Sequence, residues 1–399
     1  MALYRQIIRL LLVFAALWMF SFSAQAQESI QPGPTTVEYT MGGQIHFETQ
    51  LPPDLPVQEV WVFVHPLKNP GTIVGQATLQ PSNGVTYTLD LVEHPISAYA
   101  TVEFWYRITL EDGSTLETGP ETFVYADNRF DWQTLEAAPF EVFWYEGDTA
   151  FGQEILTAAQ EGMQKTQGFL PVPAPEAVSI YTYADPADLQ TALRLTGETG
   201  AWIAGHASPE IGAVLVTLAP GPAQNYEIKR QVPHEVAHVL LYDWLGDGYY
   251  NLPQWLREGI PSISELSPNP DYVILLNKAY ADETLLPMAS LCGSFPREAS
   301  NFLLAYAQST SFTWFIYEQY GSSGLESLTL AYADGLGCEQ GAETAFGKSL
   351  TEIERDWRQA TFGENPLPAV LKDLAPWLLL MAVVLFPSLL LIIGRKTDT

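Results

Sequence analysis

The residues most able to do chemistry lie in the stretch PHEVAHVLLYDWLGDGYYNLPQWLREG, residues 233–259. His234 and His238 are four residues apart, so on a helix both imidazoles lie on one face and can bind one metal ion. Glu235 is rotated off that axis, where its carboxylate can reach a water molecule on the metal rather than the metal itself. Unrelated proteins also carry the string HExxH, so a third ligand has to decide whether this is a zinc site.

A catalytic zinc ion needs three protein ligands and one open position. Glu258 is the candidate for the third ligand. The segment before it ends one predicted helix and contains two glycines and Pro253, so a second helix can return the carboxylate to the first. The residues around it, Trp255, Leu256 and Ile260, are apolar and favour a buried position. A simple exposed glutamate is the alternative.

This stretch resembles the gluzincin metallopeptidases, and most closely their peptidase MA-like family, whose pattern is HExxH, a connecting loop and P-x-W-L-x-E-G. The similarity continues into the helical segments that follow and covers about 139–362. The resemblance implies that His234, His238 and Glu258 bind one zinc ion. It also implies that Glu235 is the general base.

The family pattern indicates two further residues. Glu265 lies seven residues after Glu258, two turns along the same predicted helix face, where gluzincins often carry a second carboxylate. A hydrogen bond from a ligand histidine would fix that ring's tautomer; a surface glutamate is the alternative. Tyr306 matches a recurrent tyrosine of the family and is the candidate catalytic donor to the developing oxyanion, with a core tyrosine as the alternative. Other tyrosines lie nearer in the sequence: Tyr242, Tyr249 and Tyr250.

Two features depart from the family pattern. Pro233 directly precedes His234, and its missing N–H would break or kink the helix or mark its first turn. A pseudo-site that binds no metal is therefore an alternative, because a kink would displace His234 relative to Glu258. No G-x-M-E-N stretch precedes the motif, so nothing indicates an aminopeptidase.

The chain begins with MALYRQIIRLLLVFAALWMFSFSAQAQ, in which arginines precede a short apolar run and an Ala-Gln-Ala site. This pattern predicts a signal peptide at residues 1–26, removed before Gln27. Residues 374–393 carry no charge and are long enough for one transmembrane helix, with a basic flank after it. We therefore expect a cell-membrane protein whose domains lie outside the cytoplasm, with a tether at 365–373 and a cytoplasmic tail at 394–399.

Between these ends the sequence predicts a multidomain protein. Residues 28–126 contain short β-branched and aromatic runs, typical of an all-β sandwich of the immunoglobulin or fibronectin type. The sandwich has no catalytic constellation and is interpreted as a spacer or as a module that binds a surface ligand. Residues 139–364 are predicted to form an α+β zincin (gluzincin) domain with a mostly helical C-terminal half, followed by the transmembrane helix.

Composition limits the partners. The formal net charge of −28 repels nucleic acid, so no nucleic-acid partner is expected. The two cysteines, Cys292 and Cys338, lie in the predicted extracytoplasmic part and are expected to form a disulfide. No G-x-S-x-G motif supports a serine hydrolase.

These features together predict a membrane-anchored extracytoplasmic metallopeptidase with one Zn²⁺ per chain. It would hydrolyse peptides or proteins by a zinc-activated water, with Glu235 as the general base. The stretch GAVLVTLA, residues 212–219, is a candidate edge strand on which an extended peptide can lie. The alternative is a catalytically silent surface binding or scaffold protein with a gluzincin-like fold. In both readings the C-terminal helix contacts the lipid bilayer.

Overall fold

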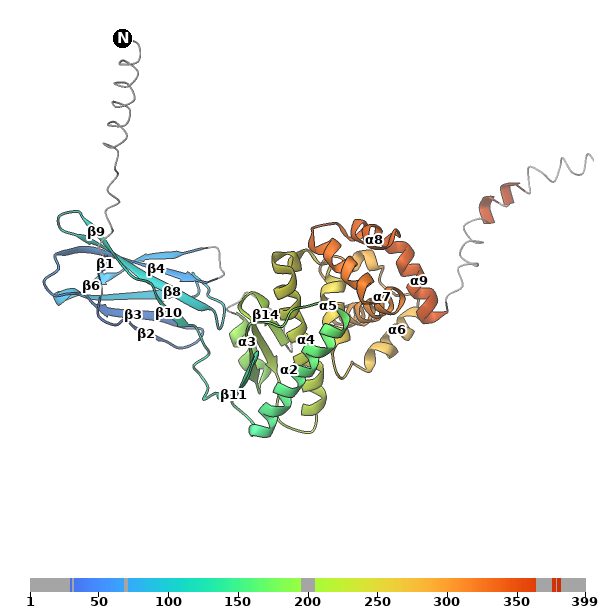
Figure 1. Cartoon of the computed structure of the whole chain (residues 1–399), viewed down its shortest axis with the longest axis horizontal. Helices are drawn as coiled ribbons and strands as arrows, with labels where there is room; N and C mark the ends of the chain where they lie inside the picture. Colours follow the sequence, from blue (N-terminus) through green and yellow to red (C-terminus); the bar gives the residue numbers. More distant parts are fainter. Residues whose placement is uncertain are drawn as a thin grey trace, which may run out of the picture. The chain divides into compact units, whose positions relative to one another are not determined.

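The computed structural model describes residues 29–30, 32–67, 71–194, 205–363, 375–377 and 379–381. The chain divides into two compact units, Met1–Arg129 with Thr191–Thr199 and Phe130–Gln190 with Gly200–Thr399 (Figure 1). The expected signal peptide, tether and cytoplasmic tail lie outside the described residues, and so does most of the expected transmembrane helix. Within the described ranges, no helix combines the length and the apolar character that a membrane crossing requires.

The first unit is rich in β-structure, as the sequence predicts. One sheet has the order β1-β9-β8-β4-β5, with β10 also paired to β8, and the other has the order β2-β3-β7-β6. The elements are β1 (Ser29–Ile30), β2 (Thr36–Tyr39), β3 (Gln44–Gln50), β4 (Val57–Pro66), β5 (Ile73–Gln76), β6 (Thr78–Leu79), η1 (Pro81–Asn83), β7 (Gly84–Asp90), β8 (Thr101–Leu110), β9 (Thr115–Thr118) and β10 (Glu121–Val124).

The core of this unit follows from the two-residue period of its strands. In β4 and β8 every second side chain is buried, including Val60, Val62, Phe104 and Tyr106. Phe47 of β3 contacts Phe104 of β8, with ring centroids 5.1 Å apart, which joins the two sheets. The resemblance to immunoglobulin or fibronectin domains stays a prediction.

The second unit begins with a five-stranded sheet of order β11-β12-β13-β15-β14. Its strands are β11 (Gln133–Ala137), β12 (Phe140–Trp144), β13 (Val178–Tyr183), β14 (Gly205–Ser208) and β15 (Ala213–Thr217). Strands β12, β13 and β15 run parallel, whereas β14 returns antiparallel beside β15. The prediction that GAVLVTLA forms an edge strand is therefore wrong: β15 pairs on both sides, because the chain turns back at η2 (Pro209–Ile211) and leaves β14 at the edge.

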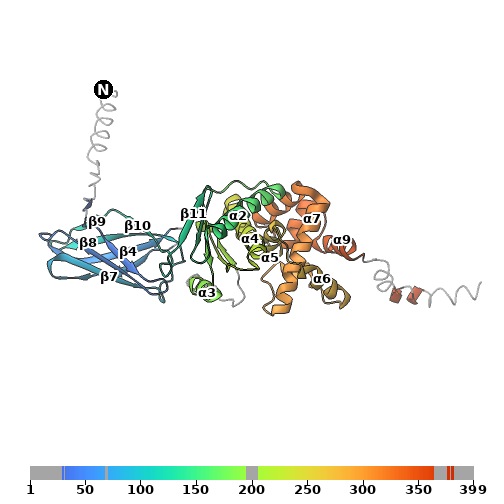
Figure 2. The same cartoon turned by 90° about the horizontal axis from the view of Figure 1, so that it is seen from below.

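Helices account for most of the second unit. They are α2 (Thr149–Phe169), α3 (Pro186–Arg194), α4 (Gln224–Leu245), η3 (Gly246–Asn251), α5 (Gln254–Ser264), α6 (Asp271–Ala281), η4 (Met288–Leu291), α7 (Ala299–Ala333), α8 (Cys338–Phe346) and α9 (Leu350–Phe362). Figures 1 and 2 show α2 and α4 next to the sheet and α5 with α7 beyond them. Buried side chains such as Ile155 of α2, Val236 of α4 and Val214 of β15 form one continuous core.

Two local predictions are confirmed in the helical part. The Ser349 hydroxyl accepts a hydrogen bond from the backbone N–H of Glu352, and the backbone N–H of Ser349 donates to the Glu352 carboxylate, which is the predicted capping box at the start of α9. Cys292, at the end of η4, and Cys338, at the start of α8, form a disulfide. The disulfide closes a loop across α7, whose helical geometry is interrupted at Gly321 (φ 70°).

Helix α4 does not break at Pro233. The helix begins at Gln224, so the proline lies in its interior rather than in its first turn. Gly162 of α2 packs directly against it: a Cβ added to Gly162 would lie 2.6 Å from the Cβ of Pro233. The predicted break is therefore wrong, and α4 continues through the HExxH motif.

Candidate metal centre

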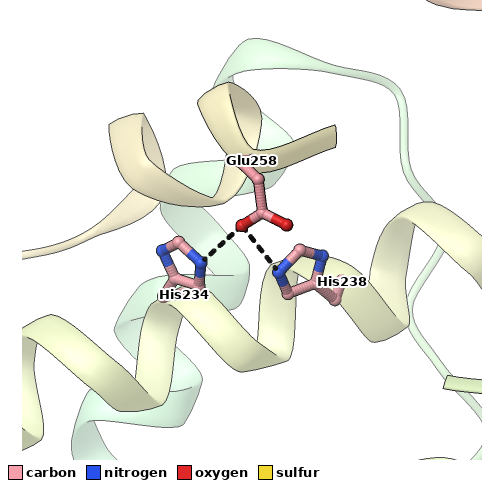
Figure 3. Close-up of side chains that lie close together, drawn as sticks. All are labelled: His234, His238 and Glu258. Atoms are coloured by element: carbon pink, nitrogen blue, oxygen red, sulfur yellow. Dashed lines mark ion pairs between the residues drawn. The ribbon is translucent and has the colours of Figure 1, made fainter. Parts of the chain in front are cut away.

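Two helices position the predicted ligands. His234 and His238 lie one turn apart on α4, and α5 brings Glu258 above them (Figure 3). Both imidazoles turn their Nε2 atoms toward one carboxylate oxygen. Oε2 of Glu258 is 3.5 Å from Nε2 of His234 and 3.7 Å from Nε2 of His238. The structure thus brings together the three residues that the sequence selected.

The spacing of these atoms fits a tetrahedral metal ion. Zinc bonds of about 2.1 Å at tetrahedral angles place neighbouring ligand atoms about 3.4 Å apart. The two measured separations lie close to that value, and all three ligand atoms lie within 4.8 Å of one another. Two imidazole nitrogens and one carboxylate oxygen also form a donor set that catalytic zinc sites use. The group can therefore hold a metal ion.

Each histidine is held at its other ring nitrogen. Nδ1 of His234 is 3.1 Å from Oε1 of Glu265, and Nδ1 of His238 is 2.9 Å from the hydroxyl of Tyr249. With a proton on each Nδ1, both Nε2 lone pairs point into the site. The predicted contact of Glu265 is present, but its predicted place on the helix is wrong. Glu265 caps α5 one residue beyond its end rather than lying along its face.

The carboxylate of Glu258 is oriented by its own helix. Nε2 of Gln254 donates to Oε1 of Glu258 at 2.9 Å, and Arg257 in turn donates to Oε1 of Gln254. One carboxylate oxygen is thereby occupied, and the other faces the histidines. Sequence reasoning missed Gln254, although it lies four residues before Glu258, the spacing at which helical side chains meet.

Comparison with known families agrees with this geometry. Residues 158–363, just over half of the chain, match the family model described as Peptidase MA superfamily. The chain belongs to the Peptidase MA superfamily. This membership gives the second unit a metallopeptidase-like fold and implies a peptide or protein as substrate.

Whole-chain comparisons with solved structures give low scores. A Br derivative of BhCBM56 aligns at 10% identity and a TM-score of 0.19, over 24% of this chain and 96% of that one. Purple acid phosphatase PPD1 from yellow lupin (Lupinus luteus) seeds aligns at 10% identity and a TM-score of 0.21, over 52% of this chain and 40% of that one. BC0361, a polysaccharide deacetylase from Bacillus cereus, aligns at 10% identity and a TM-score of 0.20, over 51% of this chain and 66% of that one. No curated protein matches the chain.

Within this Peptidase MA site, Glu235 directly follows the ligand candidate His234 and is close enough to Glu258 for the charges of the two carboxylates to interact. Its side chain is 8% exposed, and a Cβ added to Gly205 of edge strand β14 would lie 2.6 Å from its Oε1. Burial raises the pKa of Glu235 to about 7, against the opposing effect of His234, and Glu258 adds to the rise. A carboxyl with its pKa near neutrality can both take up and release a proton at neutral pH.

The ligands themselves differ in their electrostatics. Burial lowers the pKa of His238 to about 3. Burial also acts to lower the pKa of His234, but its hydrogen bonds with Glu258 and Glu265 outweigh burial and raise it to about 10. For Glu258 burial acts upward, and the two histidines outweigh it and lower the pKa to about 2. His234 thus lies between two carboxylates that favour its protonated form.

The tyrosines considered from the sequence take different positions. Tyr306 of α7 hydrogen-bonds the carboxylate of Glu258, and burial raises its pKa well above the ordinary value. Its ring lies 6.4 Å from that of His234, so it belongs to the site, and its role as oxyanion donor stays a prediction. Tyr250 instead donates to Glu210 and is half exposed. Two of these tyrosines therefore hold ligand candidates: Tyr249 contacts His238, and Tyr306 contacts Glu258.

His206 is not among the three residues that converge, but its charge acts on His238 and helps to lower the pKa of that ring. It pairs with Leu215 in the β14–β15 ladder, whereas Gly205 pairs with Val216, whose side chain is in the core beneath the helices. Gly205, which sequence reasoning did not select, is the residue of this strand that lies against Glu235.

Proposed function

We propose that this protein is a zinc-dependent metallopeptidase in which His234, His238 and Glu258 hold the zinc ion and Glu235 is the general base. The convergence of three ligand atoms on one point, with a buried carboxylate beside them, carries this proposal. When bound, zinc polarises a peptide carbonyl and makes a water molecule a better nucleophile. Membership of the Peptidase MA superfamily supports peptide bonds as the target.

The residues of the chain supply the proton transfer and the orientation. Glu235 takes a proton from the attacking water and gives it to the amine that leaves, which returns the carboxylate to its starting state. Glu265 and Tyr249 hold the histidine rings, and Gln254 holds the carboxylate of Glu258. These contacts fix the ligands before substrate arrives, so little reorganisation is needed during the reaction.

Edge strand β14 is the proposed binding strand for the substrate backbone. Among the described strands it pairs with β15 alone, so one side of its backbone can accept an extended peptide. Because Gly205 has no Cβ, the side chain of Glu235 approaches the backbone of this strand closely. The scissile bond would thereby be placed beside the general base.

We further propose, from the two apolar terminal segments of the sequence, that the enzyme is anchored in the cell membrane with its domains outside the cytoplasm.

Metal content and hydrolysis of the full-length protein in detergent test this function. We expect about one zinc ion per chain, loss of that zinc in His238→Ala, and cleavage of a mixed peptide library by the wild type. Glu235→Ala should keep the zinc and lose cleavage, because Glu235 is the base and not a ligand. His94→Ala, which removes an exposed histidine of the β-rich unit, is the matched control. A folded protein that binds no zinc from replete buffer would be a silent scaffold instead.

A further inference from the structure

A proline lies inside the ligand helix, and its position has a defined consequence for hydrogen bonding. In an α-helix the N–H of residue 233 would donate to the carbonyl of Lys229, four residues earlier. Pro233 has no N–H, so this carbonyl is left without its helical partner. Buried carbonyls without a partner are rare in folded proteins, so the acceptor has to be satisfied from elsewhere.

The partner comes from the segment that follows α5. The backbone N–H of Leu266 donates to the Lys229 carbonyl at 2.9 Å, and the N–H of Ser267 lies 3.3 Å from the same oxygen. These two residues directly follow Glu265, whose carboxylate accepts from His234 at 3.1 Å. The hydrogen bond that α4 lacks at Pro233 is therefore replaced by one from the segment directly after Glu265, the residue that contacts His234.

Neighbouring contacts hold the same segment and the same proline. Lys165 of α2 donates to the backbone carbonyl of Glu265. Gly162, one turn earlier on α2, allows that helix to pack directly on the ring of Pro233. Helix α2 thus contacts both Pro233 and the backbone at Glu265.

We propose that Pro233 is a positioning residue: by freeing the Lys229 carbonyl it fastens the Leu266–Ser267 backbone to α4 and holds Glu265 against His234. Glu265 lies one residue beyond the end of α5, so without this fastening it would stand at the start of a loop. The proline acts through Glu265 and touches no reacting atom. As a statement about metal binding the inference rests on the proposed function, whereas the hydrogen bond itself exists in the metal-free protein.

Pro233→Ala is the direct test, because alanine restores the N–H and suits a helix that already runs through this position. The restored N–H competes for the Lys229 carbonyl. In the metal-free protein we expect faster amide hydrogen exchange at Leu266 and Ser267, followed by NMR or by peptide-resolved mass spectrometry. We also expect a rise of about tenfold in the zinc dissociation constant, at the low end of effects seen when a ligand's partner is disturbed. If the alanine leaves a void that unfolds the protein, Pro233→Val restores the N–H with similar bulk.

A double-mutant cycle separates this role from general packing. If Pro233 acts through Glu265, then Pro233→Ala should change zinc affinity little in a Glu265→Ala background. Additive effects, or an unchanged zinc affinity and exchange rate in the folded single variant, would overturn the inference. A wild type that binds no zinc would instead overturn the proposed function, and the hydrogen-exchange measurement would still decide the role of Pro233.

Discussion

Gly205→Ala is a sharp test of the arrangement around the base. An added Cβ would lie 2.6 Å from Oε1 of Glu235 and 3.0 Å from its Cδ, whereas ordinary contact begins near 3.4 Å. The carboxylate or the strand therefore has to move by about 0.8 Å. A 1 Å misplacement of a catalytic group can cost about a hundredfold. We accordingly expect kcat/KM for peptide hydrolysis to fall roughly 30- to 100-fold, or about 2 to 2.7 kcal/mol of transition-state stabilisation.

The assay compares zinc content, kcat and KM of the variant with those of wild type. Zinc content should not change, because the three atoms nearest to the added Cβ all belong to Glu235 and none belongs to a ligand. A fall in kcat alone indicates a displaced base, and a rise in KM indicates a displaced binding strand. Gly168→Ala, at a glycine of α2 with open space around it, is the control. Activity of Gly205→Ala within twofold of wild type at full zinc occupancy would refute the reasoning.

Three further changes test other contacts. Tyr249→Phe should weaken zinc binding roughly tenfold or more in a chelator competition, because a ligand histidine loses its partner, and Tyr250→Phe should leave it unchanged. Replacing Cys292 and Cys338 by serine should lower the free energy of unfolding by about 4 kcal/mol in the chain-entropy treatment, given a sequence separation of 46, as urea titration would measure. Gly162→Ala places a Cβ 2.6 Å from the proline ring of α4 and should destabilise the fold by about 1 to 3 kcal/mol; a midpoint of urea unfolding equal to that of wild type would contradict this packing.

Local patterns in the sequence predicted which three side chains come together and that the C-terminal half of the second unit is mostly helical. The spacing of His234 and His238 determines which side chains share a helix face, and the turn residues after α4 place Glu258 within reach. Strand order was not predictable in this way. GAVLVTLA has the composition of a strand wherever it lies in a sheet, and only the return of β14 beside it makes it an inner strand.

The meaning of Pro233 was also outside the reach of local reasoning. The sequence shows that an N–H is missing, but it does not show that Leu266, more than thirty residues later, donates to the freed carbonyl. Tyr249 and Tyr306 illustrate the same limit. Tyr249 lies in η3 and contacts His238, whereas Tyr306 lies in α7 and contacts Glu258. These partners follow from how η3 and α7 pack, which the local sequence does not show.

The disposition of the ligand set along the chain has a consequence for how the centre assembles. The three ligands, and the side chains of Tyr249, Gln254 and Glu265 that orient them, fall within residues 234–265. Tyr306, which hydrogen-bonds Glu258 from α7, lies outside this range. A site formed by neighbours in sequence needs the closure of one short loop, whose entropic cost is small, and contacts of low sequence separation form early in folding. A metal ion bound by these residues would therefore link α4 to α5 across one short loop.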